Sequence, residues 1–272
     1  MAVSDQKQEV GRVGEASGLT YWAAPPDGIV TDRRLEAGLC HVWVASLTAD
    51  AAELGRLSRT LSETEHQRAG QFRFEKDRNA YVQCRGMLRN LLGSYLELSP
   101  ETLCFSANGR GKPYLSEASN PLDVRFNLSH SDGMALFALT RSSEVGVDIE
   151  RLQRFSDWTS VSEMAFSPRE KAELTALSRE NRVVGFFNGW TRKEAVAKAT
   201  GEGLSLGLKH IEVSLTPGAP CRILGLRGVT GGISDWSLRH LDPAPDFVGA
   251  VAIERPNAQF RFGTWRSGGC QA

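Results

Sequence analysis

The sequence has no net charge and no long apolar run. Lys plus Arg and Asp plus Glu both total 32, so the chain as a whole does not attract nucleic acid or an anionic membrane, and any anion site must be local. No span of about 18 apolar residues occurs, as a transmembrane helix would require. We therefore expect a soluble protein whose partners include neither nucleic acid nor a membrane.

The sequence also has no cysteine framework. Its five cysteines are odd in number and widely scattered, without the close pairs that bind zinc or iron. Reduced thiols of this kind predict a cytoplasmic protein. Residues 1–18 mix charged residues with glycine and contain no apolar core, so we expect a flexible N-terminus and neither a signal peptide nor a membrane anchor.

What remains is an ordinary globular composition. Of the 272 residues, 41% are hydrophobic and 24% are charged, which is typical of a folded soluble chain. The length allows one large domain or two modest ones, each with a core of its own.

The sequence pattern of the first half of the chain predicts a strand, helices and a hairpin. Residues 39–47 form a buried strand and residues 49–61 a helix. Ser62 and Glu65 have capping-box spacing before a long amphipathic helix with a basic opposite face; its apolar stripe is Tyr81, Cys84, Leu88, Leu91 and Tyr95. Residues 124–139 form a hairpin that turns at 131–133. A third strand at 145–149 would complete an antiparallel meander.

The second half repeats this order. Ser167, Pro168 and Glu170 mark a helix start, a second helix over 181–200 ends at Gly201, and three or four strands follow over 209–254. We therefore expect an α+β fold of two similar halves that meet near residue 140. The N-terminal subdomain covers 19–140, the C-terminal subdomain 141–255, and a frayed tail 256–272.

Asp148 and Glu150 lie two apart on the strand predicted at 145–149. Both carboxylates therefore point to one face, while Val147 and Ile149 pack on the other. A hard cation such as Mg²⁺ takes one or two carboxylates and completes its shell with water and substrate phosphates. Two solvated surface acids would give the same pattern.

Trp190, Glu194 and Lys198 are spaced by four on the predicted 181–200 helix and share one stripe. An exposed helix pair explains Glu194 and Lys198 equally well, although the large aromatic residue favours a cleft. If Glu194 joined the two strand acids, each carboxylate pair about 4 Å apart would repel by about 4 kcal/mol at an effective dielectric constant near 20. A metal ion would be needed to hold them together.

Two further positions suit an anionic ligand. Lys112 lies in a loop rich in glycine and polar residues at 107–121, and His130 follows the 124–129 strand. A loop lysine is often merely solvated, and a histidine at a hairpin corner can brace the turn. Both interpretations stay open at this point.

Taken in order, these segments resemble the surfactin-synthetase-activating class of 4′-phosphopantetheinyl transferases. Four ordered motifs carry the resemblance, supported by Phe166, Ser167 and Glu170 between the last two. The motifs are Gly111–Pro113 (GKP), Phe126–Ser131 (FNLSHS), Gly146–Glu150 (GVDIE) and Trp190–Lys198 (WTRKEAVAK). The resemblance covers about residues 40–255 and implies an α+β fold of two related subdomains in a pseudo-twofold arrangement, with the active site in the cleft between them.

The resemblance also implies roles for individual residues. Asp148, Glu150 and Glu194 would bind Mg²⁺, with Mn²⁺ as an alternative ion, and Glu194, Lys198 and Asp148 would be catalytic, Glu194 as the general base. Residues matching the coenzyme A site are Lys112, Ser129, His130, Lys193 and Lys198. Arg85 is a looser match, because the basic helix face does not fix which of Arg68, Arg73, Arg78 and Arg85 contacts the 3′-phosphate.

The implied activity is transfer of phosphopantetheine from coenzyme A to a serine of an apo acyl, peptidyl or aryl carrier protein. Two fused halves already supply a complete cleft, so we expect a monomer. Two alternatives share these residues: a metal-dependent hydrolase of a nucleotide diphosphate such as coenzyme A, and a non-catalytic module that binds carrier proteins.

Overall fold

The computed structural model describes residues 30–153, 158–201, 207–229, 231–266 and 269–271. The N-terminus expected at 1–18 lies outside these residues. None of the helices in the described part of the chain is long and apolar enough to cross a bilayer.

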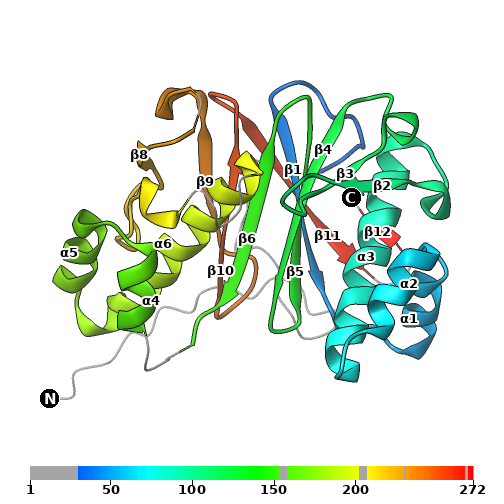
Figure 1. The fold of residues 1–272 in the computed structure, drawn as a ribbon, viewed down its shortest axis with the longest axis horizontal. Helices are drawn as coiled ribbons and strands as arrows, with labels where there is room; N and C mark the ends of the chain where they lie inside the picture. The colour runs from blue at the N-terminus through cyan, green and yellow to red at the C-terminus, as the bar shows by residue number, and fades with distance from the viewer. Residues whose placement is uncertain (1–29, 154–157, 202–206, 230, 267–268, 272) are drawn as a thin grey trace, which may run out of the picture.

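The first half of the molecule is a five-stranded sheet with helices on its outer face (Figure 1). The strand order is β12-β11-β1-β5-β4, and β1 pairs parallel to β11 but antiparallel to β5. A small β2–β3 hairpin lies beside the helices. The elements are β1 (Leu39–Ser46), α1 (Ala51–Ser58), α2 (Glu63–Gly70), α3 (Glu75–Leu96), η1 (Pro100–Thr102), β2 (Phe105–Ala107), β3 (Pro113–Leu115), η2 (Glu117–Ser119), β4 (Val124–Ser131), β5 (Met134–Arg141), β11 (Gln259–Arg266) and β12 (Gly269–Gln271).

The second half is a three-stranded sheet in the order β6-β10-β9, covered by α6. Two shorter helices and a second small hairpin, β7–β8, lie beside α6. The elements are β6 (Val145–Arg151), α4 (Trp158–Ala165), α5 (Pro168–Ala176), α6 (Arg179–Thr200), η4 (Leu208–His210), β7 (Ile211–Val213), β8 (Ile223–Leu226), η5 (Ile233–Asp235), β9 (Ser237–Leu241) and β10 (Phe247–Ile253).

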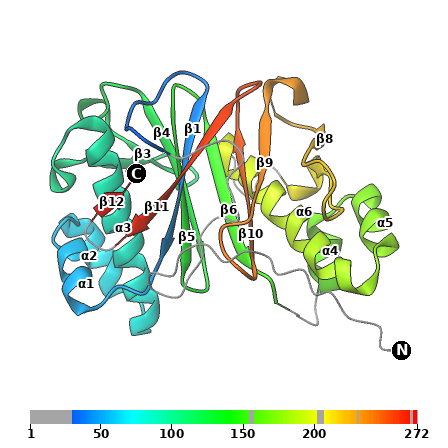
Figure 2. The same ribbon diagram turned by 180° about the vertical axis from the view of Figure 1, so that it is seen from behind.

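The two sheets stand face to face between two layers of helices (Figures 1 and 2). Val42 of β1, Val147 of β6 and Val251 of β10 meet in one fully buried apolar cluster between the sheets. A second cluster joins α3 to the outer face of the first sheet, and a third joins α6 to β10. Apolar side chains on both faces of both sheets therefore produce the helix–sheet–sheet–helix order.

Several local predictions are confirmed. Ser62 and Glu65 form a complete capping box at the start of α2, and Ser167 and Glu170 form another at the start of α5. Gly201 ends α6 in the left-handed region, with φ of +70°. The β4–β5 turn pairs Ser131 with Met134 across two residues of positive φ, as a tight hairpin requires.

Two predictions on strand pairing and the tail are wrong. β6 does not extend a meander with β4 and β5, because it pairs with β10 in the other sheet. Its apolar face covers the first sheet instead of adding to that sheet's edge. The segment predicted as a frayed tail contains β11, which pairs with β1 over six residues. Tertiary pairing between distant segments determines both outcomes, and local patterns do not encode it.

Close packing of α6 on β6 depends on Gly146. A side chain at this position would collide with the Ala195 carbonyl oxygen and the Ala199 amide nitrogen of α6. Only glycine lets the helix approach the strand so closely. This contact brings the last two turns of α6 beside Asp148 and so assembles the site described next.

Candidate active site

Asp148 is the most buried acid of β6, with 4% of its surface exposed. Its Oδ1 accepts hydrogen bonds from Ser129 Oγ at 2.8 Å and Lys198 Nζ at 2.5 Å. Burial raises the pKa of Asp148 although Lys198 opposes the shift. The second oxygen, Oδ2, is buried and has no hydrogen-bond partner among the described residues.

Glu150 lies one step along β6 on the same face. Its Oε2 accepts a hydrogen bond from Ser131 Oγ at 2.9 Å. Burial, followed by the charge of Asp148, raises the pKa of Glu150. Ser129 and Ser131 of β4 therefore each hold one carboxylate of the facing strand.

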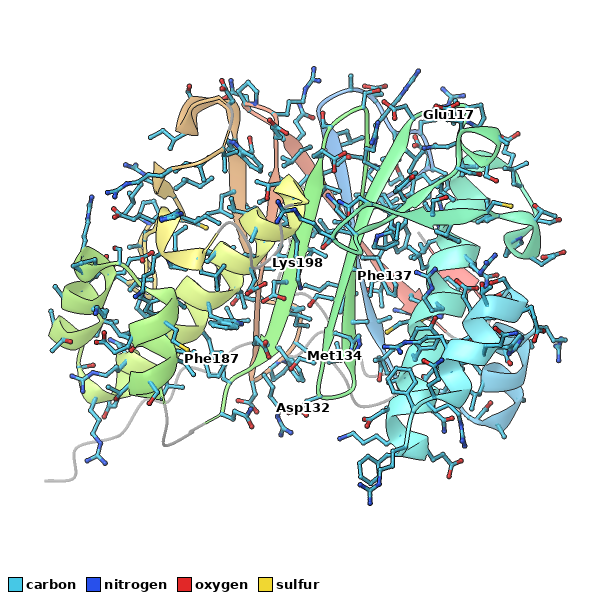
Figure 3. The ribbon with its side chains drawn as sticks, viewed as in Figure 1. Glu117, Asp132, Met134, Phe137, Phe187 and Lys198 are labelled. Atoms are coloured by element: carbon cyan, nitrogen blue, oxygen red, sulfur yellow. The ribbon has the colours of Figure 1, made fainter. Side chains whose placement is uncertain are left out.

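Glu194 and Lys198 of α6 lie near the two carboxylates of β6. Burial and then the charge of Asp148 raise the pKa of Glu194, with a smaller contribution from Glu150. Lys198 extends from α6 toward β6 (Figure 3) and also donates to Ser129 Oγ at 2.9 Å. The structure therefore brings three acids and one lysine from two elements into mutual electrostatic range.

The residues present fit a divalent ion that is completed by substrate oxygens. A buried carboxylate oxygen without a donor is costly, and a cation offsets that cost. Asp148 Oδ2 is such an atom. No three His, Cys, Asp or Glu side chains of the described ranges stand close enough to hold an ion by themselves. Mg²⁺ needs only one or two protein carboxylates when phosphates supply further ligands.

His130 lies at the end of β4, next to Ser129, and is exposed. Desolvation and the nearby Lys198 lower its pKa, while Asp77 at the start of α3 opposes the shift. Lys198 and Asp77 are therefore both within electrostatic range of the ring. An exposed neutral imidazole can still donate a hydrogen bond to an anionic ligand.

Lys112 is more constrained than the sequence indicated. Its Nζ donates to Glu144 Oε2 at 2.6 Å, to the Ala199 carbonyl at 2.9 Å and to the Val145 carbonyl at 3.3 Å. The lysine thus fastens the β2–β3 connection to the end of α6 and the start of β6. Any ligand phosphate must compete with Glu144 for this ammonium.

The structure corrects the prediction that Lys193 belongs to the coenzyme A site. Its side chain is completely buried, and Nζ forms a 2.6 Å ion pair with the equally buried Glu170. The carbonyls of Leu208 and Ile211 accept its remaining hydrogen bonds. Lys193 is five residues from Lys198, about 140° around the helix, so it faces α5 and β7 instead of Asp148. It is unavailable to a ligand phosphate.

Arg85 is also engaged. Its Nε and Nη2 donate to Glu65 Oε1 at 2.8 and 2.6 Å, and Arg89 donates to the other Glu65 oxygen at 2.7 Å. The Arg85 guanidinium stacks on the Phe105 ring, 4.7 Å from its centre. Arg85 therefore already belongs to a structural cluster with Glu65, Arg89 and Phe105. An anionic ligand could bind its guanidinium only by displacing the Glu65 carboxylate.

The sequence interpretation missed the role of Ser131. Ser131 appeared only as the start of a turn, yet its hydroxyl holds Glu150. The signal was present, because residues two apart on a strand share a face and Ser131 follows Ser129 at that spacing. Trp190, which indicated burial in the sequence, stacks on Phe186 with ring centres 6.3 Å apart.

Comparison with known proteins identifies relatives over most of the chain. Residues 144–252 match the family model of the 4′-phosphopantetheinyl transferase superfamily, and residues 46–142 match that of the 4′-phosphopantetheinyl transferase N-terminal domain. The 4′-phosphopantetheinyl transferase HetI of Nostoc is 38% identical over 78% of this chain and 86% of its own length.

Two further relatives are matched over shorter parts of their length. A putative 4′-phosphopantetheinyl transferase of Synechocystis is 33% identical over 56% of this chain and 61% of its own length. The human L-aminoadipate-semialdehyde dehydrogenase-phosphopantetheinyl transferase is 28% identical over 65% of this chain and 59% of its own length.

Proposed function

The chain belongs to the 4′-phosphopantetheinyl transferase superfamily, and we propose that the carboxylate and lysine cluster on β6 and α6 is its active site. The enzyme transfers the 4′-phosphopantetheine group of coenzyme A to a serine of an apo carrier protein. The observation that best supports this proposal is that Asp148, Glu150, Glu194 and Lys198 lie within electrostatic range of one another. They do so in a chain that is 38% identical to the transferase HetI. The ordered motifs support assignment to the surfactin-synthetase-activating class.

In the proposed reaction, the serine hydroxyl oxygen of the carrier protein forms a bond to the β-phosphorus of coenzyme A. The bond from that phosphorus to the bridging oxygen breaks, and adenosine 3′,5′-bisphosphate leaves. Glu194 takes the serine proton, directly or through a water. Its raised pKa supports this role, because a more basic carboxylate accepts a proton more readily.

Asp148 and Glu150 would hold Mg²⁺ or Mn²⁺, with Glu194 facing the same ion. When bound, the ion would neutralise charge that builds up on the leaving phosphate. Lys198 contributes to the same stabilisation and holds Asp148 in place through their ion pair. Ser129 and Ser131 fix the two carboxylates by donating a hydrogen bond to each.

His130, on the exposed end of β4 beside Lys198, is proposed to donate to the nucleotide end of coenzyme A. Lys112 and Ser129 border the same region, although both already have protein partners. We further propose a cytoplasmic monomer that modifies acyl, peptidyl or aryl carrier proteins. The hydrolase and binding-module alternatives are not favoured by the relatives, which are named as transferases.

The decisive test is a mass measurement on the carrier protein. The enzyme is incubated with coenzyme A, Mg²⁺ and an apo carrier protein, with a second reaction that contains a chelator and a third that lacks the carrier. We expect the carrier to gain one phosphopantetheine mass only in the first reaction. Coenzyme A cleavage without a carrier would instead support a hydrolase, and carrier binding without a mass change would support a binding module.

A further inference from the structure

β4 and β6 are the edge strands of two different sheets, and they lie next to each other. No backbone ladder joins them in the part of the chain that the structure describes. Alternate side chains of β4 cross to β6 instead. Asn127, Ser129 and Ser131 are two residues apart, so they share one face of β4, and each hydrogen-bonds β6. The two serines hold the side chains of Asp148 and Glu150, whereas Asn127 holds the backbone.

The backbone contact of Asn127 is at Val147, the residue before Asp148. Asn127 Oδ1 accepts a hydrogen bond from the Val147 N–H at 2.9 Å. Val147 is fully buried and Asn127 is 7% exposed. A peptide N–H can only donate, so the oxygen of the Asn127 amide must face it. Lys198 Nζ donates to the Val147 carbonyl at 3.3 Å. Side chains from β4 and α6 thus bind both polar backbone groups of Val147, in place of a neighbouring strand.

The bond at Val147 fixes the position of β6 relative to β4. Of the bonds between β4 side chains and the β6 backbone within the described ranges, it is the shorter; the other, at the last residue of β6, is 3.4 Å long. The two serine–carboxylate bonds measure 2.8 and 2.9 Å. A displacement of β6 by about 1 Å away from β4 would stretch both beyond hydrogen-bonding range. The backbone bond therefore keeps the two carboxylates opposite the two serines.

Loss of the Asn127 acceptor would leave a buried N–H without a partner. Such a group is costly, so the strand would be expected to shift until the N–H found another acceptor. A shift of β6 would move Asp148, because it is bonded directly to Val147. Asn127 thus affects the candidate metal ligands although its own side chain ends at the backbone.

We propose that Asn127 is a positioning residue for phosphopantetheine transfer. Its side-chain amide fixes β6 at Val147 and so keeps Asp148 and Glu150 where both can hold the divalent ion. Asn127 acts through β6 and not by contact with the reacting atoms. This role rests on the proposed metal site, and its tests therefore include measurements that do not depend on transfer activity.

Hydrogen exchange tests the contact without any ligand. Amide exchange rates are measured by NMR on the full-length ¹⁵N-labelled protein, free of coenzyme A and divalent ions. Asn127→Leu has a similar shape but no acceptor, so the Val147 N–H should exchange at least about tenfold faster than in the wild type. Each rate is compared with that of the buried Leu136 N–H in β5. This reference corrects for any change in global stability.

Ion binding is then measured apart from turnover. Mn²⁺ is titrated into the protein with coenzyme A and no carrier protein, and electron paramagnetic resonance reports the free ion. Asn127→Leu should raise the Kd for Mn²⁺ by about tenfold, because groups that orient metal ligands typically contribute about 10–100-fold in affinity. Asn127→Ala removes the same acceptor with a smaller side chain, so it gives a second test if the leucine variant folds poorly.

Asn127→Asp is the conservative variant. It keeps an oxygen that can accept from the Val147 N–H, so exchange at Val147 should stay close to the wild-type rate. Its added negative charge attracts a cation, so Mn²⁺ affinity should be at least that of the wild type. In steady-state transfer assays, Asn127→Leu should need about tenfold more Mg²⁺. At saturating Mg²⁺ its kcat should largely recover, and its KM for coenzyme A should be nearly normal.

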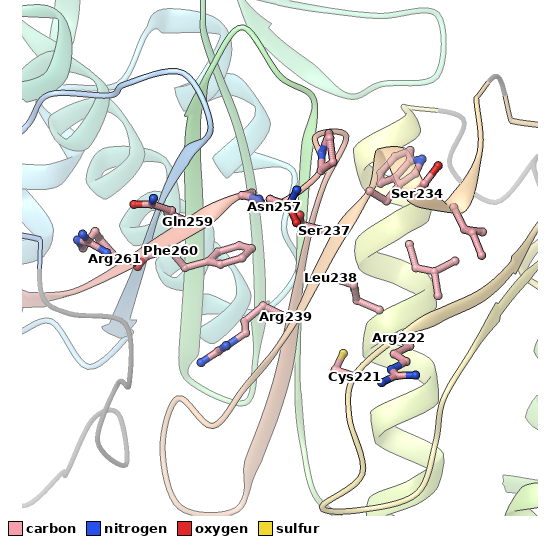
Figure 4. Close-up of a pocket in the computed structure, with 15 residues that line it drawn as sticks. Cys221, Arg222, Ser234, Ser237, Leu238, Arg239, Asn257, Gln259, Phe260 and Arg261 are labelled. Atoms are coloured by element: carbon pink, nitrogen blue, oxygen red, sulfur yellow. Dashed lines mark hydrogen bonds between the residues drawn. The ribbon is translucent and has the colours of Figure 1, made fainter.

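Two controls remove side chains that bind a backbone N–H elsewhere. Asn120 Oδ1 accepts from the Val124 N–H at 2.7 Å, and Ser237 Oγ accepts from the Ala258 N–H at 3.0 Å. Ser237 is labelled in Figure 4 on the wall of a cavity of about 850 Å³. Asn120→Leu and Ser237→Ala should lower thermal stability but leave Mn²⁺ affinity and the Mg²⁺ requirement unchanged, because neither side chain holds β6.

The positioning role is overturned if Asn127→Leu leaves Val147 exchange or Mn²⁺ affinity unchanged, or if Asn127→Asp is as impaired as Asn127→Leu. It is also overturned if the two controls weaken Mn²⁺ binding equally, or if the wild type binds no Mn²⁺ in the presence of coenzyme A. A wild-type protein that binds Mn²⁺ but modifies no carrier protein would contradict the proposed transfer function alone. The exchange and Mn²⁺ measurements would still decide whether Asn127 positions the metal ligands.

Discussion

Lys198 Nζ lies 2.5 Å from Asp148 Oδ1, although the two residues come from different elements and are 50 positions apart in the chain. The ion pair leaves the other carboxylate oxygen of Asp148 without a donor. Lys198 therefore offsets part of the cost of burying Asp148 while one oxygen stays available to a cation. The close approach of α6 at Gly146 makes this arrangement attainable.

Asp148→Asn should reduce transfer by about 10² or more, because an amide oxygen is a much weaker ligand for a divalent ion than a carboxylate. Asparagine has a similar shape and can still accept from Ser129, so the free energy of unfolding should change by about 1 kcal/mol at most. Steady-state kinetics and urea unfolding measure the two effects. Glu63→Gln, on the exposed start of α2, is the control. Normal activity in folded Asp148→Asn would refute the metal assignment.

Ser131→Ala should raise the Mg²⁺ concentration needed for half-maximal activity by about tenfold, because hydrogen-bonding partners of metal ligands orient them. Saturating Mg²⁺ should recover most of the rate, since Glu150 itself remains. Ser131→Thr retains the hydroxyl and should restore the normal Mg²⁺ dependence. An unchanged Mg²⁺ requirement in Ser131→Ala would mean that its hydrogen bond to Glu150 only stabilises the turn.

The pair Lys193→Met and Lys198→Met separates a structural lysine from a catalytic one. Lys193→Met leaves the buried Glu170 carboxylate without its partner and should cost about 3–5 kcal/mol of folding free energy. Adding Glu170→Gln should recover part of this loss. Lys198→Met removes the partner of the buried Asp148, so it should lose some stability as well, but it should remain folded and lose activity. Thermal unfolding and transfer assays distinguish the two, and a stable, inactive Lys193→Met variant would contradict our correction.

His130→Ala should mainly weaken coenzyme A binding, whereas Lys112→Met should mainly lower stability. His130 is exposed, so its removal should raise the KM for coenzyme A with little change in thermal stability. Lys112 joins three acceptors across the two halves, so its loss should lower stability by about 1–3 kcal/mol. Coenzyme A titration and thermal unfolding test both. If His130→Ala binds coenzyme A with unchanged affinity, the nucleotide-site proposal for His130 fails.

Local chemistry determined which parts of the fold could be predicted. Capping boxes at Ser62 and Ser167 and the tight turn at Gly133 depend only on neighbouring residues, and these predictions are confirmed. The pairing of β6 with β10 depends on which apolar faces meet after collapse. Valine and isoleucine on a strand favour burial, but they do not specify the partner strand.

The same limit applies to the candidate site. Spacing placed Asp148 and Glu150 on one face, and the resemblance supplied Glu194 and Lys198. It also suggested Lys193, because lysines within one motif look equivalent in sequence. Helix phase separates them, since Lys193 faces Glu170 and Lys198 faces Asp148. Only coordinates reveal that Lys112 and Arg85 already have carboxylate partners.

Acid should destabilise the protein partly through His41. This residue is 2% exposed, its Nδ1 lies 2.6 Å from the Tyr95 hydroxyl, and burial lowers its pKa to about 4. An unfolded histidine titrates near pH 6.5, so between these values the unfolded chain binds the extra proton. The neutral folded form is therefore favoured above about pH 6.5, and this contribution, about 3 kcal/mol, is lost as the pH falls toward 4. Urea unfolding of the wild type and of His41→Gln across this range measures the slope. The variant should show a smaller loss of stability in acid, because glutamine does not titrate; an identical slope would show that His41 is not the group that binds the proton.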